Sequence, residues 1–348
     1  MPPGRDWVDS CGVPVRMFGE SWPERYRGYV FALGVGWTLW AERKNYQVAY
    51  FLMQGIHLLT GLLIARLLGK AIVMKFSGSS LVAVMASSMT GRLSLFLLRK
   101  WADRILILNS GMLEECRQVG FDLSKVSWMP NPVDTNEFKP CTPAEKIEKR
   151  IQLGLPIEAP IIVFVGRLDY PKKIPSMLGA FQKVIAQRPD TILAIVGDGP
   201  LREQIHALVD ELGLKRNVVL TGRLPMSGVL EWLQLSDLTT LVSEVEGLSC
   251  SLIEAMAAGL PAVVSAIPAN TQLIAHEENG LLTELGNEES IAAALLRIVN
   301  DEPLRMRLGQ RARQRMIAEF STGQVVKYYE NLFNEILSPA KDSVRPVA

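Results

Sequence analysis

The sequence has few residues that could form a disulfide framework or an all-protein metal site. Its four cysteines are scattered without a CxxC pair, and it has only three histidines. Structural zinc sites and disulfide-rich scaffolds need such residues in close sets, so both classes are excluded. The cysteine content fits a reducing cytoplasm.

A strong net charge is also absent. Lys plus Arg number 37 and Asp plus Glu 36, so the formal charge is +1. A general nucleic-acid binder is far more basic, so we expect no nucleic-acid partner. The total is uneven, because residues 1–140 carry 16 basic and 11 acidic side chains (+5), whereas residues 141–348 carry 21 and 25 (−4). The difference favours an anionic surface or acceptor beside the first half, with chance scatter as an equal alternative.

No secretory signal opens the chain, and only one stretch is long and uncharged enough to span a bilayer. Residues 46–65 carry no formal charge but include Gln47, Gln54 and His57. They divide into an expected strand near 47–53 and an apolar helix near 55–68, which argues against a membrane span. Residues 92–104 interleave leucines with basic side chains. They are either a segment lying on an anionic membrane or a core helix with a basic end, so the protein is expected in the cytoplasm with a peripheral membrane contact as one option.

The sequence does contain a regular alternation of short apolar runs and amphipathic stretches. In the second half the expected strands are 161–165, 191–196, 218–220, 238–242 and 261–265. In the first half they are 13–17, 48–53, 71–76, 105–109 and 126–129. This alternation predicts an α/β protein with two Rossmann-like, doubly wound domains. We assign residues 1–155 to the first domain, 156–337 to the second and 338–348 to a disordered tail, with a polar linker helix over 145–153.

Two glycine-containing turns follow expected strands of the second half, where ligands of doubly wound sheets bind. After the strand at 161–165, Gly166 allows a close approach of the backbone, and Arg167 and Lys172 supply two cations. An ordinary surface turn is the alternative. After the strand at 191–196, Gly197 and Gly199 form a second turn, which lacks the third glycine of the GxGxxG dinucleotide fingerprint.

A third stretch combines two acids with a helix start. Glu246 lies in a loop, and Glu254 lies eight residues later inside an expected helix. The amides near Ser251 and Leu252 would form the helix N-terminus, which favours a phosphate, and Glu254 could accept hydrogen bonds from a ribose diol. The alternative is that Ser249 or Ser251 caps the helix and Glu254 complements its dipole.

Taken in order, these stretches resemble the GT-B glycosyltransferases, specifically glycosyltransferase family 4. The resemblance covers about residues 45 to 320. It rests on Gly166-Arg167-Leu168 through Lys172, on VGDGPLR at 196–202, on the E-x7-E pair, on NPVDTNEF at 131–138, and on AAGLP at 257–261 with NGL at 279–281.

The resemblance implies retaining transfer of a sugar from a nucleoside-diphosphate sugar, with UDP favoured over GDP, to a glycan or a lipid-linked saccharide. Arg167, Lys172 and Glu246 match the catalytic positions, and Glu254 matches the ribose acid. The other implied donor-binding residues are Gly166, Gly197, Gly199, Arg223, Leu224, Gly247, Leu248, Ser249, Ser251 and Leu252. Since no Asp-x-Asp pair is present to hold a divalent ion, we expect no metal and no cofactor.

The chain departs from the family pattern in its first half. The opening strand and glycine-rich loop of the family are not found, so we expect an incomplete first domain with fewer strands than the second. No histidine stands at the expected strand ends, where Lys75, Gly78 and Ser79 are instead the candidates for acceptor contacts. Lys173 occupies a position where glycine is usual. The competing hypotheses are a catalytically inactive GT-B scaffold that binds nucleotide or a partner protein, and a nucleotide-sugar epimerase.

Overall fold

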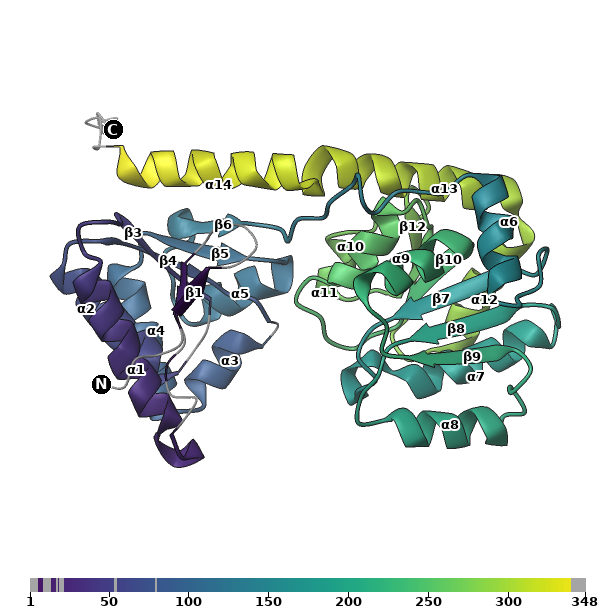
Figure 1. Ribbon diagram of the computed structural model, residues 1–348, viewed down its shortest axis with the longest axis horizontal. Coiled ribbons are helices and arrows are strands. Elements are labelled where there is room, and N and C mark those ends of the chain that lie inside the picture. Colours follow the sequence, from purple (N-terminus) through teal and green to yellow (C-terminus); the bar gives the residue numbers. More distant parts are fainter. Residues whose placement is uncertain are drawn as a thin grey trace. The chain divides into compact units, whose positions relative to one another are not determined.

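The protein divides into two compact units, each with its own parallel sheet (Figure 1). The structure is a computed structural model that describes residues 6–8, 14–16, 18, 22–52, 55–78 and 80–338. One unit comprises residues up to Met129 together with those from Lys327 onward, and the other comprises Pro130–Val326. The boundary therefore falls at Pro130, whereas the sequence suggested one near residue 155. The expected tail at 338–348 lies outside the described residues except for Ser338.

The first unit contains a four-stranded parallel sheet in the order β3-β4-β5-β6. Its elements are α1 (Glu24–Ala41), β3 (Val48–Phe51), α2 (Ile56–Leu67), β4 (Ala71–Lys75), α3 (Leu81–Ala86), α4 (Met89–Trp101), β5 (Arg104–Ile107), α5 (Ser110–Gln118) and β6 (Val126–Trp128). The second half of α14 (Thr322–Leu337) belongs to it as well, because Tyr329 contacts Tyr50 of β3 and Glu335 contacts Arg104 of β5.

The strand expected at 13–17 is not part of this parallel sheet. It forms as β2 (Pro14–Arg16) and pairs antiparallel with β1 (Asp6–Val8), while Val13 and Met17 lie outside the described residues. A short extended run carries no sign of the direction of its partner, so its sequence could not separate the two pairings. With four strands described in the first parallel sheet and six in the second, the expectation of fewer strands in the first is confirmed for the described residues.

The second unit is a doubly wound domain around a six-stranded parallel sheet in the order β12-β11-β10-β7-β8-β9. Its strands are β7 (Ile161–Val165), β8 (Ile192–Val196), β9 (Val218–Gly222), β10 (Leu238–Leu241), β11 (Ala262–Ser265) and β12 (Gly280–Thr283). Its helices are α6 (Pro143–Gln152), α7 (Ile174–Ile185), α8 (Arg202–Glu211), α9 (Met226–Leu235), α10 (Cys250–Ala257), α11 (Pro268–Thr271), α12 (Glu288–Asn300) and α13 (Glu302–Arg315). Strand β12 was not expected from the sequence, because it begins at Gly280 and glycine is typical of a turn.

Continuous apolar strands explain why this sheet lies in the centre of the unit. Residues 161–164 of β7 are fully buried, as are most residues of β8 and β11. A strand that is apolar on both faces needs helices on both sides, which the βαβ connections provide. Each strand thus ends at the same edge of the sheet, and the loops that follow the strands are brought together there.

The uncharged stretch at 46–65 is a strand and a helix, as the sequence predicts. Strand β3 covers Val48–Phe51 and helix α2 covers Ile56–Leu67. Among the described residues, no helix combines the length and the apolar character needed to cross a bilayer.

Helix α6, expected as a linker, is held on the second unit by a buried ion pair. Arg150 is 4% exposed, and its guanidinium donates to Asp237 Oδ2 at 2.8 Å and to the Leu235 carbonyl at 2.9 Å. Lys146 Nζ lies 2.7 Å from Asp237 Oδ1, and the Ile161 amide donates to Asp237 at 2.7 Å. Asp237 therefore joins α6 to the start of β7.

The electrostatics of this cluster favour the ionised acid. Burial by itself would raise the pKa of Asp237, but Lys146, Arg150 and the Ile161 amide outweigh it and hold the pKa below the usual range. A carboxyl with a lowered pKa stabilises the fold above its unfolded-state pKa, and this contribution is lost as pH falls through the folded value. The ion pairs of Asp237 with Lys146 and Arg150 therefore stabilise the second unit at neutral pH, and this stabilisation is lost in acid.

We expect Asp237→Asn to destabilise the protein strongly at neutral pH. It leaves the guanidinium of Arg150 buried without its counter-charge, which costs about 3–5 kcal/mol. Asp210→Asn is the matched control, because Asp210 pairs with Lys215 at an exposed site and should cost no more than about 1 kcal/mol. Urea unfolding at pH 7 measures both variants, and equal losses would contradict the structural role of Asp237.

Candidate functional site

The candidate site lies where the order of the second sheet reverses. Strand β7 pairs with β8 on one side and with β10 on the other. The chain leaves β7 toward β8 and β9, and later leaves β10 toward β11 and β12. The loops after β7 and β10 therefore diverge, and such a switch point is where open α/β sheets bind ligands.

Two glycines let the loops after β7 and β8 approach each other closely. A Cβ atom on Gly197 would lie 1.9 Å from the Gly166 carbonyl oxygen, and one on Gly199 would lie 2.4 Å from the Leu168 carbonyl oxygen. Gly197 also has a φ of +149°, which L-residues with side chains rarely adopt. The backbone hydrogen bond from Leu168 N to Asp198 O, at 3.0 Å, joins the same loops. Both glycines are thus required by the geometry of the site.

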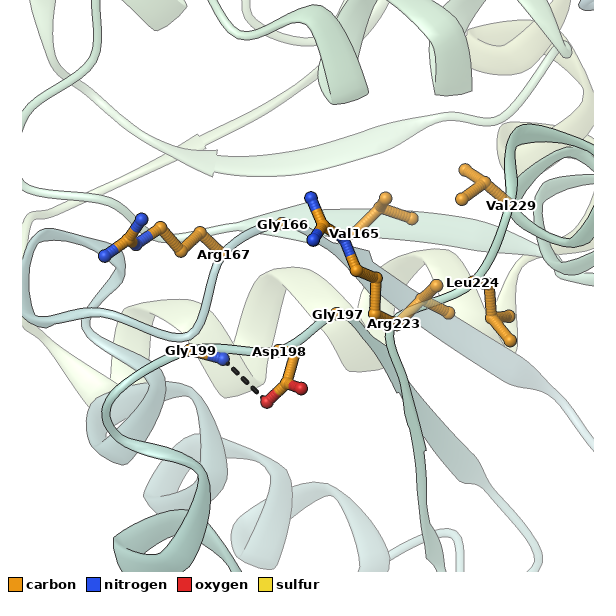
Figure 2. A pocket seen from close by; sticks show the side chains of 10 residues that line it. Val165, Gly166, Arg167, Gly197, Asp198, Gly199, Arg223, Leu224 and Val229 are labelled. Carbon is orange, nitrogen blue, oxygen red and sulfur yellow. Dashed lines mark hydrogen bonds between the residues drawn. The ribbon is translucent and has the colours of Figure 1, made fainter. Parts of the chain in front are cut away.

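A pocket of about 480 Å³ opens beside these glycine turns (Figure 2). It includes five of the residues expected for the donor and the adjoining Asp198 and Val229. Figure 2 shows the Arg223 side chain extending toward the Val165–Gly166 turn, whereas the guanidinium of Arg167 points away from it. The full lining is Val165, Gly166, Arg167, Val196, Gly197, Asp198, Gly199, Arg223, Leu224 and Val229. The structure therefore brings Gly166, Arg167, Gly197, Gly199, Arg223 and Leu224 to one pocket.

Lys172 and Glu246 form an ion pair next to this pocket. Lys172 Nζ lies 2.5 Å from Glu246 Oε1, and the two side chains are 16% and 10% exposed. A Cβ on Gly166 would lie 3.8 Å from Lys172 Cε, which places the lysine stem beside the pocket wall. Two residues 74 positions apart are thus joined at the switch point. The strand-end rule brings Lys172 and Glu254 to one edge of the sheet, but it does not predict the pairing of Lys172 with Glu246.

Lys173, the next residue, forms a second ion pair between the same two loops. It has a left-handed backbone with φ +49° and ψ 36°. Its Nζ lies 2.7 Å from Glu244 Oε2 and 4.6 Å from the centre of the Tyr170 ring. The Glu244 amide also donates to the Pro171 carbonyl at 2.8 Å. Sequence reasoning missed Glu244, since no motif marks it.

The start of α10 carries the small residues expected near a phosphate. Ser249 is the N-cap and accepts a hydrogen bond from the Leu252 amide at 3.3 Å, so the capping alternative is confirmed for Ser249. The Ser249 and Ser251 hydroxyl oxygens lie 3.1 Å apart. Asn131 donates to the Leu248 carbonyl at 3.4 Å, so the 131–138 stretch lies beside this helix start. Gly247 and Leu248 complete the loop between Glu246 and the cap.

Glu254 lies inside α10, beyond its first turn. Burial raises the pKa of Glu254 to about 7, and the neighbouring carboxylate of Glu137 adds to this shift. Glu254 is not among the residues that line the pocket. A half-buried carboxyl whose pKa is raised by burial and by a like charge is a candidate for a functional group.

The acceptor-side candidates lie in the first unit. Lys75, at the end of β4, is 6% exposed, and its Nζ lies 3.3 Å from the Tyr329 hydroxyl of α14. The Tyr329 hydroxyl is also 3.0 Å from that of Tyr50, whose pKa is raised by burial and by this contact. Gly78 has open space around its Cα, and Ser79 lies outside the described residues. The contact between Lys75 and α14 was not foreseeable, because 254 positions separate Lys75 from Tyr329.

His57 is packed against an aromatic ring, and the described residues form no cluster that could hold a metal ion. His57 packs edge-on against Phe31 with ring centres 5.0 Å apart, and burial lowers its pKa. Within the described residues, no group of three or more His, Cys, Asp or Glu side chains is placed to hold a metal ion. The site therefore offers cations, backbone amides and two carboxyls for binding an anionic ligand.

Comparison with known proteins agrees with this arrangement. Residues 145–315 match the family described as glycosyl transferases group 1. The N-acetyl-alpha-D-glucosaminyl L-malate synthase of Bacillus anthracis is 23% identical over 91% of this chain and 82% of its own length. The UDP-Gal:alpha-D-GlcNAc-diphosphoundecaprenol alpha-1,3-galactosyltransferase of Escherichia coli is 29% identical over 71% of this chain and 66% of its own length.

Solved structures show the same fold at low sequence identity. Anabaena HepE in complex with UDP and glucose superposes with a TM-score of 0.78 at 19% identity, covering 93% of this chain and 87% of HepE. The sucrose-phosphate synthase of Thermosynechococcus elongatus gives a TM-score of 0.79 at 20% identity, covering 95% and 85%. With a reversing parallel sheet and two glycine turns at its carboxyl edge, the chain has the GT-B fold of these solved structures, and residues 145–315 match the glycosyl transferases group 1 family.

Proposed function

We propose that the protein transfers a sugar from UDP-sugar to a glycan or a lipid-linked saccharide, with retention at the anomeric carbon, as a family 4 enzyme. The observation that carries this proposal is the Lys172–Glu246 pair at the switch point, beside a pocket that Arg167 and Arg223 line. A diphosphate needs cations and backbone amides close to one another, and this edge of the sheet supplies both.

The choice of uridine is supported by the relatives. HepE is described in complexes with UDP and with UDP-glucose, and the E. coli relative is named for a UDP-Gal donor. A Corynebacterium glutamicum relative is named as GDP-mannose-dependent, but it is 28% identical over 56% of this chain, less than the E. coli enzyme covers. We therefore take UDP as the first ligand to test.

Transfer of the sugar requires that the leaving diphosphate be stabilised. When the bond between the anomeric carbon and the diphosphate oxygen breaks, its electron pair stays on the diphosphate and adds negative charge. Cations and helix amides held away from bulk water stabilise such charge directly, because they need little reorganisation. We assign this role to Lys172 and the start of α10. Arg167 is 70% exposed and lies 3.2 Å from Asp169, so its guanidinium would have to turn toward the pocket to share the role. Glu246 would face the sugar, and Glu254 would hold the ribose.

No metal is required in this scheme, because side-chain cations take the place of a divalent ion. Transfer should therefore continue in the presence of a chelator. Loss of UDP binding or of UDP release on addition of EDTA would contradict this part of the proposal.

The proposed activity is tested by release of UDP from UDP-glucose, UDP-galactose and UDP-N-acetylglucosamine. Each donor is incubated with the protein, with and without lipid and glycan extracts as acceptors. Acceptor-stimulated release supports transfer. UDP binding without release from any donor favours the inactive scaffold, and a changed sugar on an intact donor favours an epimerase.

The Lys172 side chain gives the sharpest test of the diphosphate contact. A charged hydrogen bond contributes about 1.5–3 kcal/mol, so Lys172→Ala should weaken UDP binding about 10- to 100-fold while barely changing uridine binding. Calorimetry with both ligands measures the difference. Lys183→Ala is the matched control, because Lys183 is an ion-paired lysine of the same unit outside the pocket. An unchanged UDP affinity in Lys172→Ala would remove the assigned role.

Glu254 should make nucleoside binding depend on pH. A ribose diol donates hydrogen bonds, so it favours the ionised carboxyl, and its affinity should fall as pH drops below about 7, where Glu254 takes up a proton in the free protein. The decline should approach about tenfold per pH unit. Uridine is the ligand of choice, since it has no phosphate that titrates in this range.

Two variants check the source of this pH dependence. Glu254→Gln cannot ionise, so its weaker uridine binding should not vary between pH 6 and 8. Glu137→Gln removes the neighbouring negative charge, so it should move the wild-type profile to lower pH. A wild-type affinity that is flat across this range would rule out Glu254 as the ribose ligand.

The turn that carries Lys172 is preorganised at the expense of backbone strain at Lys173. A left-handed conformation costs a residue with a side chain about 1–2 kcal/mol relative to glycine. We therefore expect Lys173→Gly to be about 1 kcal/mol more stable than Lys173→Ala, although both lose the pair with Glu244. Urea unfolding compares the two. Equal stabilities would mean that residue 173 is not left-handed in solution.

A further inference from the structure

Helix α1 of the first unit has its small residues inside and its large apolar residues outside. Ala32, Gly34 and Gly36 are the buried residues of the helix. A Cβ on Gly36 would lie 2.9 Å from Thr60 Cγ2 of α2, and one on Gly34 would lie 2.4 Å from the Phe18 ring. Glycines thus let α1 pack closely on its neighbours at the two sides of the helix, while several of its large side chains stay exposed.

The outer face of α1 forms a continuous stripe of exposed aromatic and apolar side chains. The stripe consists of Tyr26, Tyr29, Leu33, Trp37 and Trp40, which are 44%, 61%, 58%, 61% and 49% exposed. Their spacing of three and four residues keeps them within about 80° of arc on a helix with 3.6 residues per turn. A helix on a water-facing surface instead buries its apolar side chains and exposes polar ones. We call this face the aromatic stripe.

Arginines lie at both ends of the aromatic stripe. The Arg25 guanidinium carbon is 4.7 Å from the centre of the Tyr26 ring, and that of Arg43 is 5.1 Å from the centre of the Trp40 ring. The acids nearest in sequence are Glu24 and Glu42, and Glu42 is neutralised by Arg16 at 2.9 Å. Residues 43–102, which include α2 and α4, contain eight lysines and arginines and no acidic residue.

Helices α2 and α4 also expose large apolar side chains. Helix α2 packs against both α1 and α4. It exposes Leu63 and Leu67, and α4 exposes Leu93 and Phe96. The other leucines of α4, at positions 95, 97 and 98, are buried, so α4 is mainly a core helix with a basic end. The aromatic stripe is therefore a better candidate for a membrane contact than the segment 92–104 that the sequence suggested.

We propose that the aromatic stripe binds an anionic lipid surface, with α1 lying parallel to the membrane plane. Tyr and Trp side chains have an apolar body and a polar edge, and both are enriched at the level of lipid headgroups. Exposed aromatic and apolar side chains bury at this interface, and anionic lipids attract the arginines beside them. Arg25 and Arg43 would contact lipid phosphates at the two ends of the stripe.

Charge favours a lipid surface over a second copy of the chain as the occupant. Two copies that met through this face would bring together arginine ends of the same sign. Like charges across an interface oppose association, whereas an anionic bilayer is complementary to them. The inference is separate from sugar transfer, because no nucleotide is needed to measure it.

Cosedimentation with lipid vesicles tests the proposal. The full chain is mixed with vesicles of phosphatidylcholine alone and with vesicles of phosphatidylcholine plus phosphatidylglycerol. We expect binding to the anionic vesicles, weaker binding at high salt, and a blue shift of tryptophan fluorescence on binding. Equal binding to both vesicles, or binding to neither, would overturn the proposal.

Paired variants locate the binding face. Tyr29→Ser with Trp37→Ser should weaken binding to the anionic vesicles about 10- to 100-fold, because less apolar surface is buried. Arg25→Glu with Arg43→Glu should weaken it at least about tenfold. The matched control is Ile151→Ser with Met306→Ser, which removes apolar side chains that are 59% and 67% exposed on the other unit. It should bind like the wild type.

Two further readouts keep the test decisive. Circular dichroism and thermal unfolding establish that each paired variant is folded, and a second, milder pair (Tyr29→His with Trp37→His) replaces one that is not. Binding by folded stripe variants that equals the control overturns the proposal. So does sedimentation in the absence of lipid that shows a wild-type dimer and monomeric stripe variants, since the face would then belong to a second copy.

Discussion

The central constraint on the second unit is the position of β7 between β8 and β10. Because the chain continues outward from β7 on one side and from β10 on the other, no helix can cover the gap above their carboxyl ends. On the β8 side of β7, Gly197 and Gly199 allow the carbonyls of Gly166 and Leu168 to lie where a Cβ would clash, so the loops after β7 and β8 approach closely. The pocket, the Lys172–Glu246 pair and the start of α10 all follow from this one arrangement.

The sequence predicted those parts that depend on local pattern or on a general rule of topology. Fully buried strands such as β7 and β8 appear as unbroken apolar runs, and glycine turns after them mark the ligand edge. The strand-end rule placed Lys172 and Glu254 at the same edge of the sheet, but it did not foresee that Lys172 pairs with Glu246 across 74 positions. Other features depend on contacts that leave no local signal. Tyr329 reaches Lys75 from the far end of the chain, α6 packs on the second unit through a buried ion pair, and the short β2 pairs antiparallel.

The two lysines at the end of the β7 loop show how adjacent residues acquire different roles. Lys172 pairs with Glu246 and Lys173 with Glu244, and Val245 between the two acids is 44% exposed. Both acids belong to the loop between β10 and α10, and both reach the turn that follows β7. The left-handed conformation of Lys173 redirects the chain between the two lysines. One pair is thereby largely buried beside the pocket, while the other joins the loops closer to solvent.

Two buried carboxyls of this unit differ in the direction of their pKa shifts, and the difference separates structure from ligand binding. For Asp237 the desolvation penalty is outweighed by Lys146, Arg150 and a backbone amide, so its ionised form stabilises the fold. For Glu254, burial raises the pKa, and the like-charged carboxylate of Glu137 raises it further. A carboxyl that is harder to ionise in the folded state than in the unfolded chain lowers stability as pH rises from its ordinary pKa of 4.5 toward the folded pKa of about 7. A ligand that donates hydrogen bonds to the ionised form reverses this loss, because it stabilises the charge that burial opposes. This is the physical reason why our proposal assigns the ribose to Glu254 and a structural role to Asp237.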